Sequence, residues 1–159
     1  LGVWSEWNHE AELDWGLAGR PQHAGMLRFV EDLNRLYRDE PALWEQDFAE
    51  RGFEWIDCND SDNSVVSFVR KDGSGRRLLL VVVNFTPVPR FNYQIGAPRS
   101  GHWDEVLNSD APLYGGSGQG NYGGVSTAPV AAHGRYHSLT LTLPPLAVVC
   151  FRNVAGEGA

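Results

Sequence analysis

The stretch SEWNHEAELDW, residues 5–15, concentrates the side chains best suited to chemistry. Two of its carboxylates could supply the pair that a glycoside hydrolase needs, and His9 could act as a base or as a metal ligand. Such a pair must be held several Å apart by rigid elements, whereas this loop is bounded by glycines. We therefore expect solvated charges here, with no catalytic residue and no metal site. The four carboxylates belong to Glu6, Glu10, Glu12 and Asp14.

Three of the six tryptophans of the chain fall within residues 4–15. An indole ring can stack on the apolar face of a sugar, and neighbouring polar side chains can bind the sugar hydroxyls. Packing in a hydrophobic core is an equally open interpretation for each ring. The candidate substrate-binding residues are Trp4, Trp7, Asn8, His9, Asp14 and Trp15.

The elements that must position these residues begin with a helix. Residues 1–22 follow no hydrophobic period and contain several glycines. From Met26 the apolar residues follow a three-four spacing, and Pro41 ends the run, which predicts an amphipathic helix over residues 24–39. Such a helix needs a large surface to cover its apolar face. That face is formed by Met26, Phe29, Leu33 and Leu36.

Short β-rich runs follow the helix. HSLTLTL alternates apolar and polar residues as a half-buried strand does, and KDGSGR has the composition of a hairpin turn. Seven such runs predict a mainly β fold, an antiparallel β-sandwich that begins near residue 48. Trp55 is expected in its core. The runs are FEWIDC, VVSFVRK, LLLVVVNF, YQI, HWDEVL, HSLTLTL and LAVVCF.

The glycine-rich segment YGGSGQGNYGG, residues 114–124, could be taken for a phosphate-binding loop. It lacks the GK[ST] ending of such loops, and no clear helix follows it. We interpret it as a surface loop between strands. Tyr114, Asn121 and Tyr122 would allow it a carbohydrate contact.

The charge balance limits the partners. Thirteen basic against twenty acidic residues give a net charge of -7, without a basic cluster, which argues against nucleic acid or an anionic membrane. The apolar run Leu78–Val83 is too short to span a bilayer, and the first residues lack a signal-peptide pattern. Cys58 and Cys150 lie in strand-like segments without metal-ligand spacing. We expect both to be buried free thiols, which favours a reducing cytoplasm.

Several long motifs resemble one family. SEWNHEAELDW is similar to the W-x-E-W-N-H-x-x-x-L-D-W segment that follows the eighth barrel strand of bacterial glycogen branching enzymes, members of the α-amylase superfamily. FVEDLNRLYRDEPAL resembles their last barrel helix, and GFEWIDCNDSDNSVVSFVRK resembles the entry to their C-terminal β domain. NFTPVPR, EVLNSDAPLYGGSGQGN and HGRYHSLTLTLPPLAVV resemble later parts of that domain.

The resemblance implies that residues 1–47 are the last active-site-side loop and helix of a (β/α)8 barrel, with the all-β domain at 48–159. It implies a parent enzyme that cleaves α-1,4-glucan and transfers the chain to a 6-hydroxyl, without a cofactor. The catalytic carboxylates of the family lie upstream, so we expect this chain alone to be inactive. The missing barrel would pack on the helix, and the loop would shape the glucan cleft or brace its wall.

The residues leave two other interpretations open. The chain could be a free-standing β domain that binds α-glucan. It could also be the C-terminal part of another α-amylase superfamily enzyme, such as a debranching or trehalose-forming enzyme.

Overall fold

The computed structural model describes residues 6–155, which form one long helix and eight strands. A 3-10 helix, η1 (Trp15–Gly19), precedes α1 (Pro21–Asp39), and the short helices η2 (Pro41–Leu43) and η3 (Glu50–Gly52) lead to the first strand. A further 3-10 helix, η4 (Pro112–Tyr114), follows the fifth strand. The strands are β1 (Phe53–Asp60), β2 (Val65–Lys71), β3 (Arg77–Asn84), β4 (Arg90–Ala97), β5 (His102–Asn108), β6 (Gly124–Ser126), β7 (His137–Leu143) and β8 (Ala147–Val154).

The strands form two antiparallel sheets. A six-stranded sheet has the order β1-β2-β3-β8-β5-β6, and β4 pairs with β7 in a two-stranded sheet. The mainly β, antiparallel fold expected from the sequence is thus confirmed. Strand β6 was not expected, because it has only three residues and follows directly on the glycine-rich segment.

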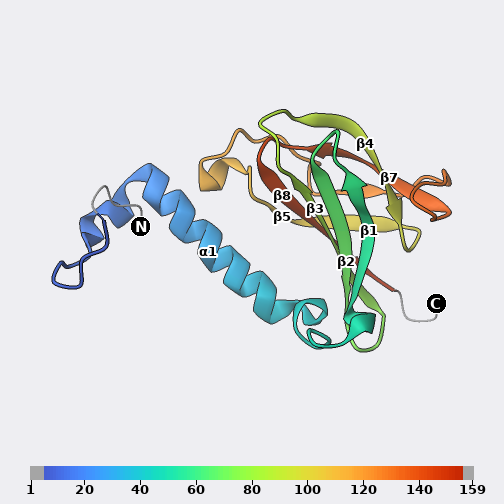
Figure 1. Cartoon of the computed structure of the whole chain (residues 1–159), viewed down its shortest axis with the longest axis horizontal. Coiled ribbons are helices and arrows are strands. Elements are labelled where there is room, and N and C mark those ends of the chain that lie inside the picture. Colours follow the sequence, from blue (N-terminus) through green and yellow to red (C-terminus); the bar gives the residue numbers. More distant parts are fainter. Residues whose placement is uncertain (1–5, 156–159) are drawn as a thin grey trace.

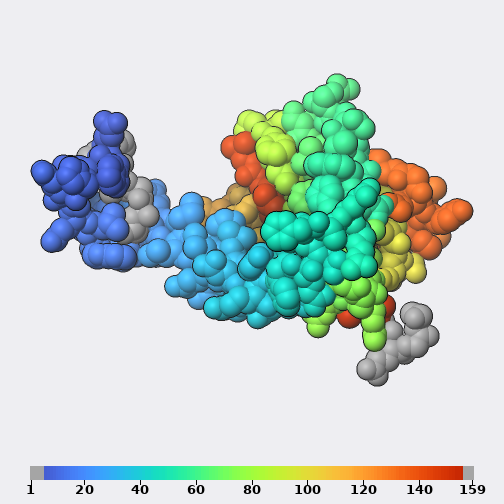
Figure 2. Space-filling view, turned by 60° about the horizontal axis from the view of Figure 1, so that its bottom comes forward, coloured from blue at the N-terminus to red at the C-terminus, as the bar shows by residue number. Residues whose placement is uncertain are grey.

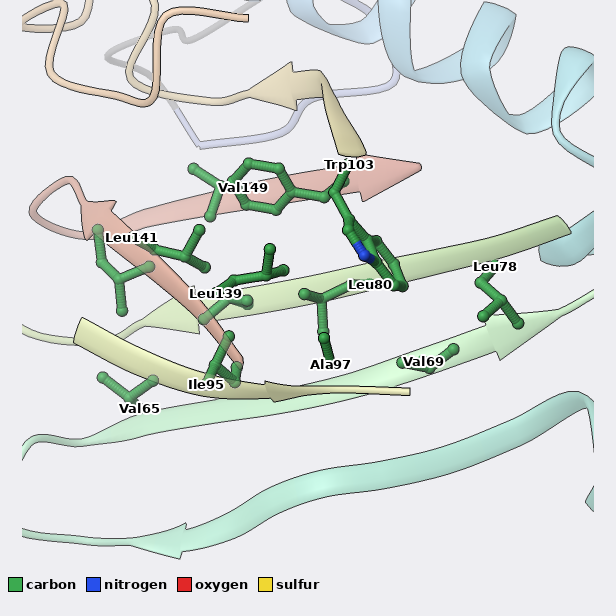
Figure 3. Packing of buried hydrophobic residues seen from close by; sticks show 13 residues of the cluster. Val65, Val69, Leu78, Leu80, Ile95, Ala97, Trp103, Leu139, Leu141 and Val149 are labelled. Atoms are coloured by element: carbon green, nitrogen blue, oxygen red, sulfur yellow. The ribbon is translucent and has the colours of Figure 1, made fainter. Parts of the chain in front are cut away.

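The six-stranded sheet is buried on both faces at its centre. Side chains alternate between the faces of a strand, and in β3 Leu80 and Val82 point toward the two-stranded sheet while Leu79 and Val81 point the other way. This explains why residues 78–83, LLLVVV, are continuously apolar. We call the core between the two sheets the first core; Figure 3 shows it, with Trp103 filling the space between the sheets. Its indole Nε1 donates a hydrogen bond to the Arg99 carbonyl at 3.2 Å.

Helix α1 covers the other face only in part. It begins with Pro21 in its first turn and ends before Pro41. In Figure 1 its last half approaches the sheet, whereas its first half extends away from the sheet. On this face Leu79, Val81, Leu107 and Cys150 belong to a second core. Phe29 and Leu36 of α1 pack against it.

The apolar face of α1 is therefore divided, which differs from the sequence expectation. Met26 and Leu33, expected on the same face as Phe29 and Leu36, are 58% and 37% exposed. Because each residue turns the helix by about 100°, a second apolar stripe lies beside the first. We call this second stripe the outer stripe of α1. It consists of Met26, Val30, Leu33 and Tyr37, all exposed.

Two expectations about buried residues in β1 were wrong. Trp55 is 51% exposed, and the thiol of Cys58 is exposed, although Cys150 is buried as expected. Strand β1 lies at the edge of its sheet, and its register with β2 shifts after Trp55 and again after Asp57. Such irregularities interrupt the alternation of side chains, so position in the strand no longer predicts burial.

Candidate functional site

The loop that the sequence singled out is held by short-range bonds. Asn8 Oδ1 accepts a hydrogen bond from the Glu10 backbone N–H at 3.0 Å. Asp14 Oδ1 accepts one from the Gly16 N–H at 2.9 Å and so caps η1. The rings of Trp7 and His9 lie 6.1 Å apart. The structure therefore brings Trp7 near His9, while Asp14 and Trp15 belong to the start of η1.

Every residue from Glu6 to Gly16 is exposed. The indoles of Trp7 and Trp15 are 83% and 70% exposed, so within the described residues neither ring is part of a core. Trp4, the remaining candidate, lies outside the described residues. Figure 2 shows this region as a lobe that stands apart from the β domain. The candidate residues among residues 6–155 are thus presented to the surroundings.

A second feature, which the sequence did not reveal, joins α1 to the β domain. The Tyr114 hydroxyl donates a hydrogen bond to Asp32 Oδ2 at 2.8 Å. Arg28 Nε donates to the same oxygen at 3.2 Å, and Arg35 forms an ion pair with the other oxygen. The bond from Tyr114 and the two arginines lower the pKa of Asp32, whereas burial raises the pKa of Tyr114 to about 12.

Close packing accompanies this polar contact. The rings of Phe29 and Tyr114 meet edge to face with centroids 5.1 Å apart. Gly25 lies against the same segment, because a Cβ on it would come within 2.5 Å of the Tyr114 carbonyl oxygen. A hollow of ≈ 500 Å³ lies between the first turns of α1 and η4. Tyr114, a candidate for carbohydrate contact, instead holds the helix.

The glycine-rich segment is a shaped loop. The Asp110 carboxylate accepts hydrogen bonds from Ser117 N–H at 2.9 Å and from Gln119 N–H at 3.3 Å. Gly118 has φ +82°, a left-handed conformation that suits glycine. A Cβ on Gly116 would lie 2.2 Å from the Asp110 carbonyl oxygen, which leaves room only for glycine.

This loop passes around the edge of the six-stranded sheet. It begins at Tyr114 against α1 on one face and reaches β7 on the other, where Asn121 Nδ2 donates to the Thr142 carbonyl at 3.1 Å. In return, Thr142 N–H donates to Asn121 Oδ1 at 2.8 Å. The buried Asn121 is thus engaged within the fold, so of the three candidates in this segment only Tyr122 is free to contact a ligand.

Three aromatic rings form a partly exposed cluster on strands β1 and β2. Trp55 lies 5.0 Å from Phe53 and 5.8 Å from Phe68, measured between ring centroids. Phe68 also packs against the second core, so the cluster adjoins the face on which α1 lies. We call Phe53, Trp55 and Phe68 the aromatic patch. Phe53 and Trp55 stand two positions apart, so the sequence places both side chains on one face of β1, and Phe68 of β2 pairs with Trp55. The sequence alone did not show which face of the sheet is covered.

Two other kinds of feature, a metal centre and a membrane-spanning helix, are absent from residues 6–155. No group of three or more His, Cys, Asp or Glu side chains lies close enough together there to hold a metal ion. Within the same residues, no helix combines the length and apolar character needed to cross a membrane.

Comparison with known proteins identifies the β domain. The family model described as "Alpha amylase, C-terminal all-beta domain" matches residues 55–154. The chain belongs to this family. A solved structure of a trehalulose synthase mutant in complex with Tris aligns with 84% of this chain and 18% of that chain, at 23% identity and a TM-score of 0.48.

Curated relatives match nearly the whole chain, including the opening loop and α1. The 1,4-alpha-glucan branching enzyme GlgB of Aromatoleum aromaticum is 63% identical over 149 residues, which cover 94% of this chain and 23% of that enzyme. The corresponding enzyme of Aquifex aeolicus is 52% identical, with coverages of 96% and 24%. The resemblance to branching enzymes is thereby confirmed. The chain spans about a quarter of the length of these relatives.

Proposed function

We propose that the chain is the C-terminal part of a 1,4-α-glucan branching enzyme. The observation that carries this proposal is the 63% identity that runs through 94% of the chain. Residues 1–47 would be the last active-site-side loop and helix of the catalytic barrel, and residues 48–159 the all-β domain. The high identity to branching enzymes favours this assignment over a debranching or trehalose-forming enzyme.

The parent enzyme would act by retaining transglycosylation. An α-1,4 bond is cleaved through a covalent glycosyl-enzyme, and the bound chain passes to a 6-hydroxyl of another glucan. This chemistry needs two carboxylates at a fixed separation in a cleft. The exposed acids of residues 6–14 lack that support, so we expect no cleavage or transfer of amylose by this chain alone.

We assign the outer stripe of α1 and the aromatic patch to contact with the missing barrel. Both carry exposed apolar side chains on or beside the same face of the six-stranded sheet, and another protein surface commonly covers a surface of this kind. The outer stripe turns away from the β domain, while Phe29 and Leu36 on the same helix are already engaged with it. The helix would then be clamped between the barrel and the β domain.

We assign the opening loop to the wall of the glucan cleft. Trp7 and Trp15 present large exposed rings, and Asn8, His9 and Asp14 stand beside them. Rings of this kind stack on sugars, and the amide, imidazole and carboxylate can bind hydroxyl groups. The partner would be α-1,4-glucan or glycogen, without a cofactor. Two cysteines that form no disulfide accord with a cytoplasmic enzyme.

A chimera tests the proposal. This chain would replace the corresponding C-terminal part of the branching enzyme of Aromatoleum aromaticum, and the product would be incubated with amylose. We expect α-1,6 branches, detected as a shift of the iodine colour and as chains released by a debranching enzyme. The native relative serves as the positive control, and this chain alone as the negative one. A chimera that folds as well as the relative but forms no branches would refute the assignment.

A further inference from the structure

Tyr122 has an unusual conformation for a large residue. Its φ is +53°, in the left-handed region that bulky side chains rarely adopt, and its side chain is fully exposed. No burial of the ring offsets this backbone strain. Residues with a strained backbone often occur at functional sites, so a functional role for Tyr122 would explain its conformation.

The base of Tyr122 is rigid. Its neighbour Asn121 bonds both to Thr142 of β7 and to Glu105 of β5, whose carboxylate accepts from Asn121 N–H at 3.1 Å and from Asn121 Nδ2 at 3.0 Å. On the other side, a Cβ on Gly124 would come within 2.6 Å of the Trp103 carbonyl oxygen, so the chain lies directly on β5. The exposed ring therefore stands on a fixed support.

A hollow of ≈ 380 Å³ lies beside the ring. Outward-facing residues of β4 and β7 form its polar wall, because Leu139 and Leu141 of β7 point into the core. Apart from the Tyr122 phenol, the side chains that line the hollow carry no ionisable group. That wall contains Asn92, Thr140 and Thr142.

The chemistry of this hollow selects a class of ligand. An aromatic ring offers an apolar stacking surface, and amide and hydroxyl groups exchange hydrogen bonds with hydroxyls. Without a charge the hollow has nothing to pair with an anion or a cation. A neutral, polyhydroxylated ring fits this combination, and a sugar is such a ring.

We infer that Tyr122 and the hollow beside it bind a segment of α-glucan chain. The identity of the sugar rests on the proposed function, whereas the geometry itself asks only for a neutral sugar. The hollow lies with β4 and β7 on one face of the six-stranded sheet, and α1 lies on the other face. A barrel that covers α1 would therefore leave this site open. It would hold a glucan chain at a distance from the opening loop.

Nuclear magnetic resonance can test the site on the whole chain. Maltoheptaose is titrated into the ¹⁵N-labelled protein, and amide shifts are followed. We expect saturable shifts of the amides of residues 120–125 and 140–142. Replacement of Tyr122 by Ala should weaken this binding about tenfold, because the stacking surface is lost. Tyr122→Phe should retain it.

A matched variant and a second sugar make the test decisive. Tyr136 is also a highly exposed tyrosine but does not line the hollow, so Tyr136→Ala should leave the affinity unchanged. Unaltered binding by Tyr122→Ala, or shifts confined to residues 6–16, would overturn the inference. Equal, Tyr122-dependent binding of cellohexaose would overturn its α-glucan specificity.

The inference and the proposed function can fail separately. Affinity for maltoheptaose is measured without turnover, whereas branching is measured in the chimera. A chimera that branches amylose while the Tyr122 site binds nothing would remove this inference alone. If the Tyr122 site binds maltoheptaose but the chimera makes no branches, only the proposed function is refuted.

Discussion

At the scale of single residues, two tryptophans with similar sequence surroundings differ in their environment. Trp103 lies in a strand at the centre of the first core and has no exposed surface, whereas Trp55 lies in an edge strand and is about half exposed. Burial of a large side chain stabilises the fold by removing apolar surface from water and by filling space between the sheets. The two residues should therefore contribute unequally to stability.

We expect Trp103→Ala to lower the free energy of unfolding by about 3 to 5 kcal/mol, because it empties a large volume in the core. Trp55→Ala should cost only about 1 kcal/mol, since it removes the aromatic contacts of an exposed patch. Denaturant unfolding of both variants measures the difference. An equal loss in the two variants would mean that the aromatic patch is as important to this fold as the core.

The two cysteines allow a second comparison. Burial raises the pKa of the Cys150 thiol to about 12, so this group keeps its proton in the folded protein. Cys58 is exposed. A disulfide reagent at pH 8 should modify one thiol quickly in the native chain and the second only after unfolding. The Cys58→Ser variant should lose the fast reaction.

The raised pKa of Cys150 also predicts a pH dependence. Above about pH 9 the unfolded chain loses this thiol proton while the folded chain retains it, so the contribution to stability is complete below that pH and decreases as the pH rises. Cys150→Ala should show a weaker decline of stability between pH 9 and about pH 11. The same decline in both proteins would contradict the assignment to Cys150.

Sequence patterns predicted some of these residues and not others. Leu139 and Leu141 are buried as the alternation of HSLTLTL predicts, because β7 lies with one face on the core. Trp55 and Cys58 were wrongly predicted to be buried, because register shifts in a strand at the edge of a sheet do not change the hydrophobic pattern of the sequence. The exposure of Trp7 could not be predicted either, because a tryptophan in this sequence could pack in a core or contact a sugar equally well.

At the scale of elements, α1 is joined to the β domain mainly through η4 and the second core. Sequence spacing predicted the helix over 24–39, close to the observed Pro21–Asp39. It could not predict which apolar side chains face the β domain. That division depends on Tyr114, more than seventy residues away, whose hydroxyl reaches Asp32. Contacts at such separation leave no local pattern.

The Tyr114–Asp32 bond should be visible in titration. The lowered pKa of Asp32 means that the folded state favours its carboxylate form and gains stability from it. This contribution to the stability is complete above pH 3.8, the ordinary pKa, and is lost as the pH falls through the lowered pKa of the folded state. Tyr114→Phe should raise the pKa of Asp32 toward 3.8, as measured by carbon NMR of its carboxyl group. It should also speed hydrogen exchange in α1 relative to β3.

A matched pair in the same chain supplies the control. Tyr93 and Asp60 lie outside α1, and the Tyr93 hydroxyl donates a hydrogen bond to Asp60 Oδ2 at 2.7 Å. Burial alone would raise the pKa of Asp60, but this and other hydrogen bonds lower it. Tyr93→Phe should raise the pKa of Asp60 and leave Asp32 unchanged. A change of Asp32 in both variants would indicate a general loosening of the fold instead of a local bond.

At the scale of the whole molecule, two exposed apolar surfaces lie close to the face of the six-stranded sheet that α1 covers. These surfaces are the outer stripe of α1 and the aromatic patch. The first half of the helix extends from the β domain (Figures 1 and 2). An apolar surface of this kind is costly to leave in water. It accords with a chain that spans about a quarter of its relatives.

Replacement of residues in the outer stripe should therefore have different effects in the two contexts. In this chain alone, Val30 and Leu33 are partly exposed, so the double change of both to Ser should alter the free energy of unfolding by less than about 1 kcal/mol. In the chimera the barrel would bury both side chains, and the same change should cost about 2 to 5 kcal/mol. Thermal or denaturant unfolding of the four proteins gives the comparison.

Asn34→Ser, at a neighbouring exposed position outside the stripe, is the control and should be nearly neutral in both contexts. The double variant should also reduce any self-association of the isolated chain, measured by sedimentation over a range of concentrations, because it removes the apolar surface that drives association. If the double change costs no more in the chimera than in the isolated chain, the barrel does not cover the outer stripe. The helix would then be held by the β domain alone, through Phe29, Leu36 and the Tyr114–Asp32 bond.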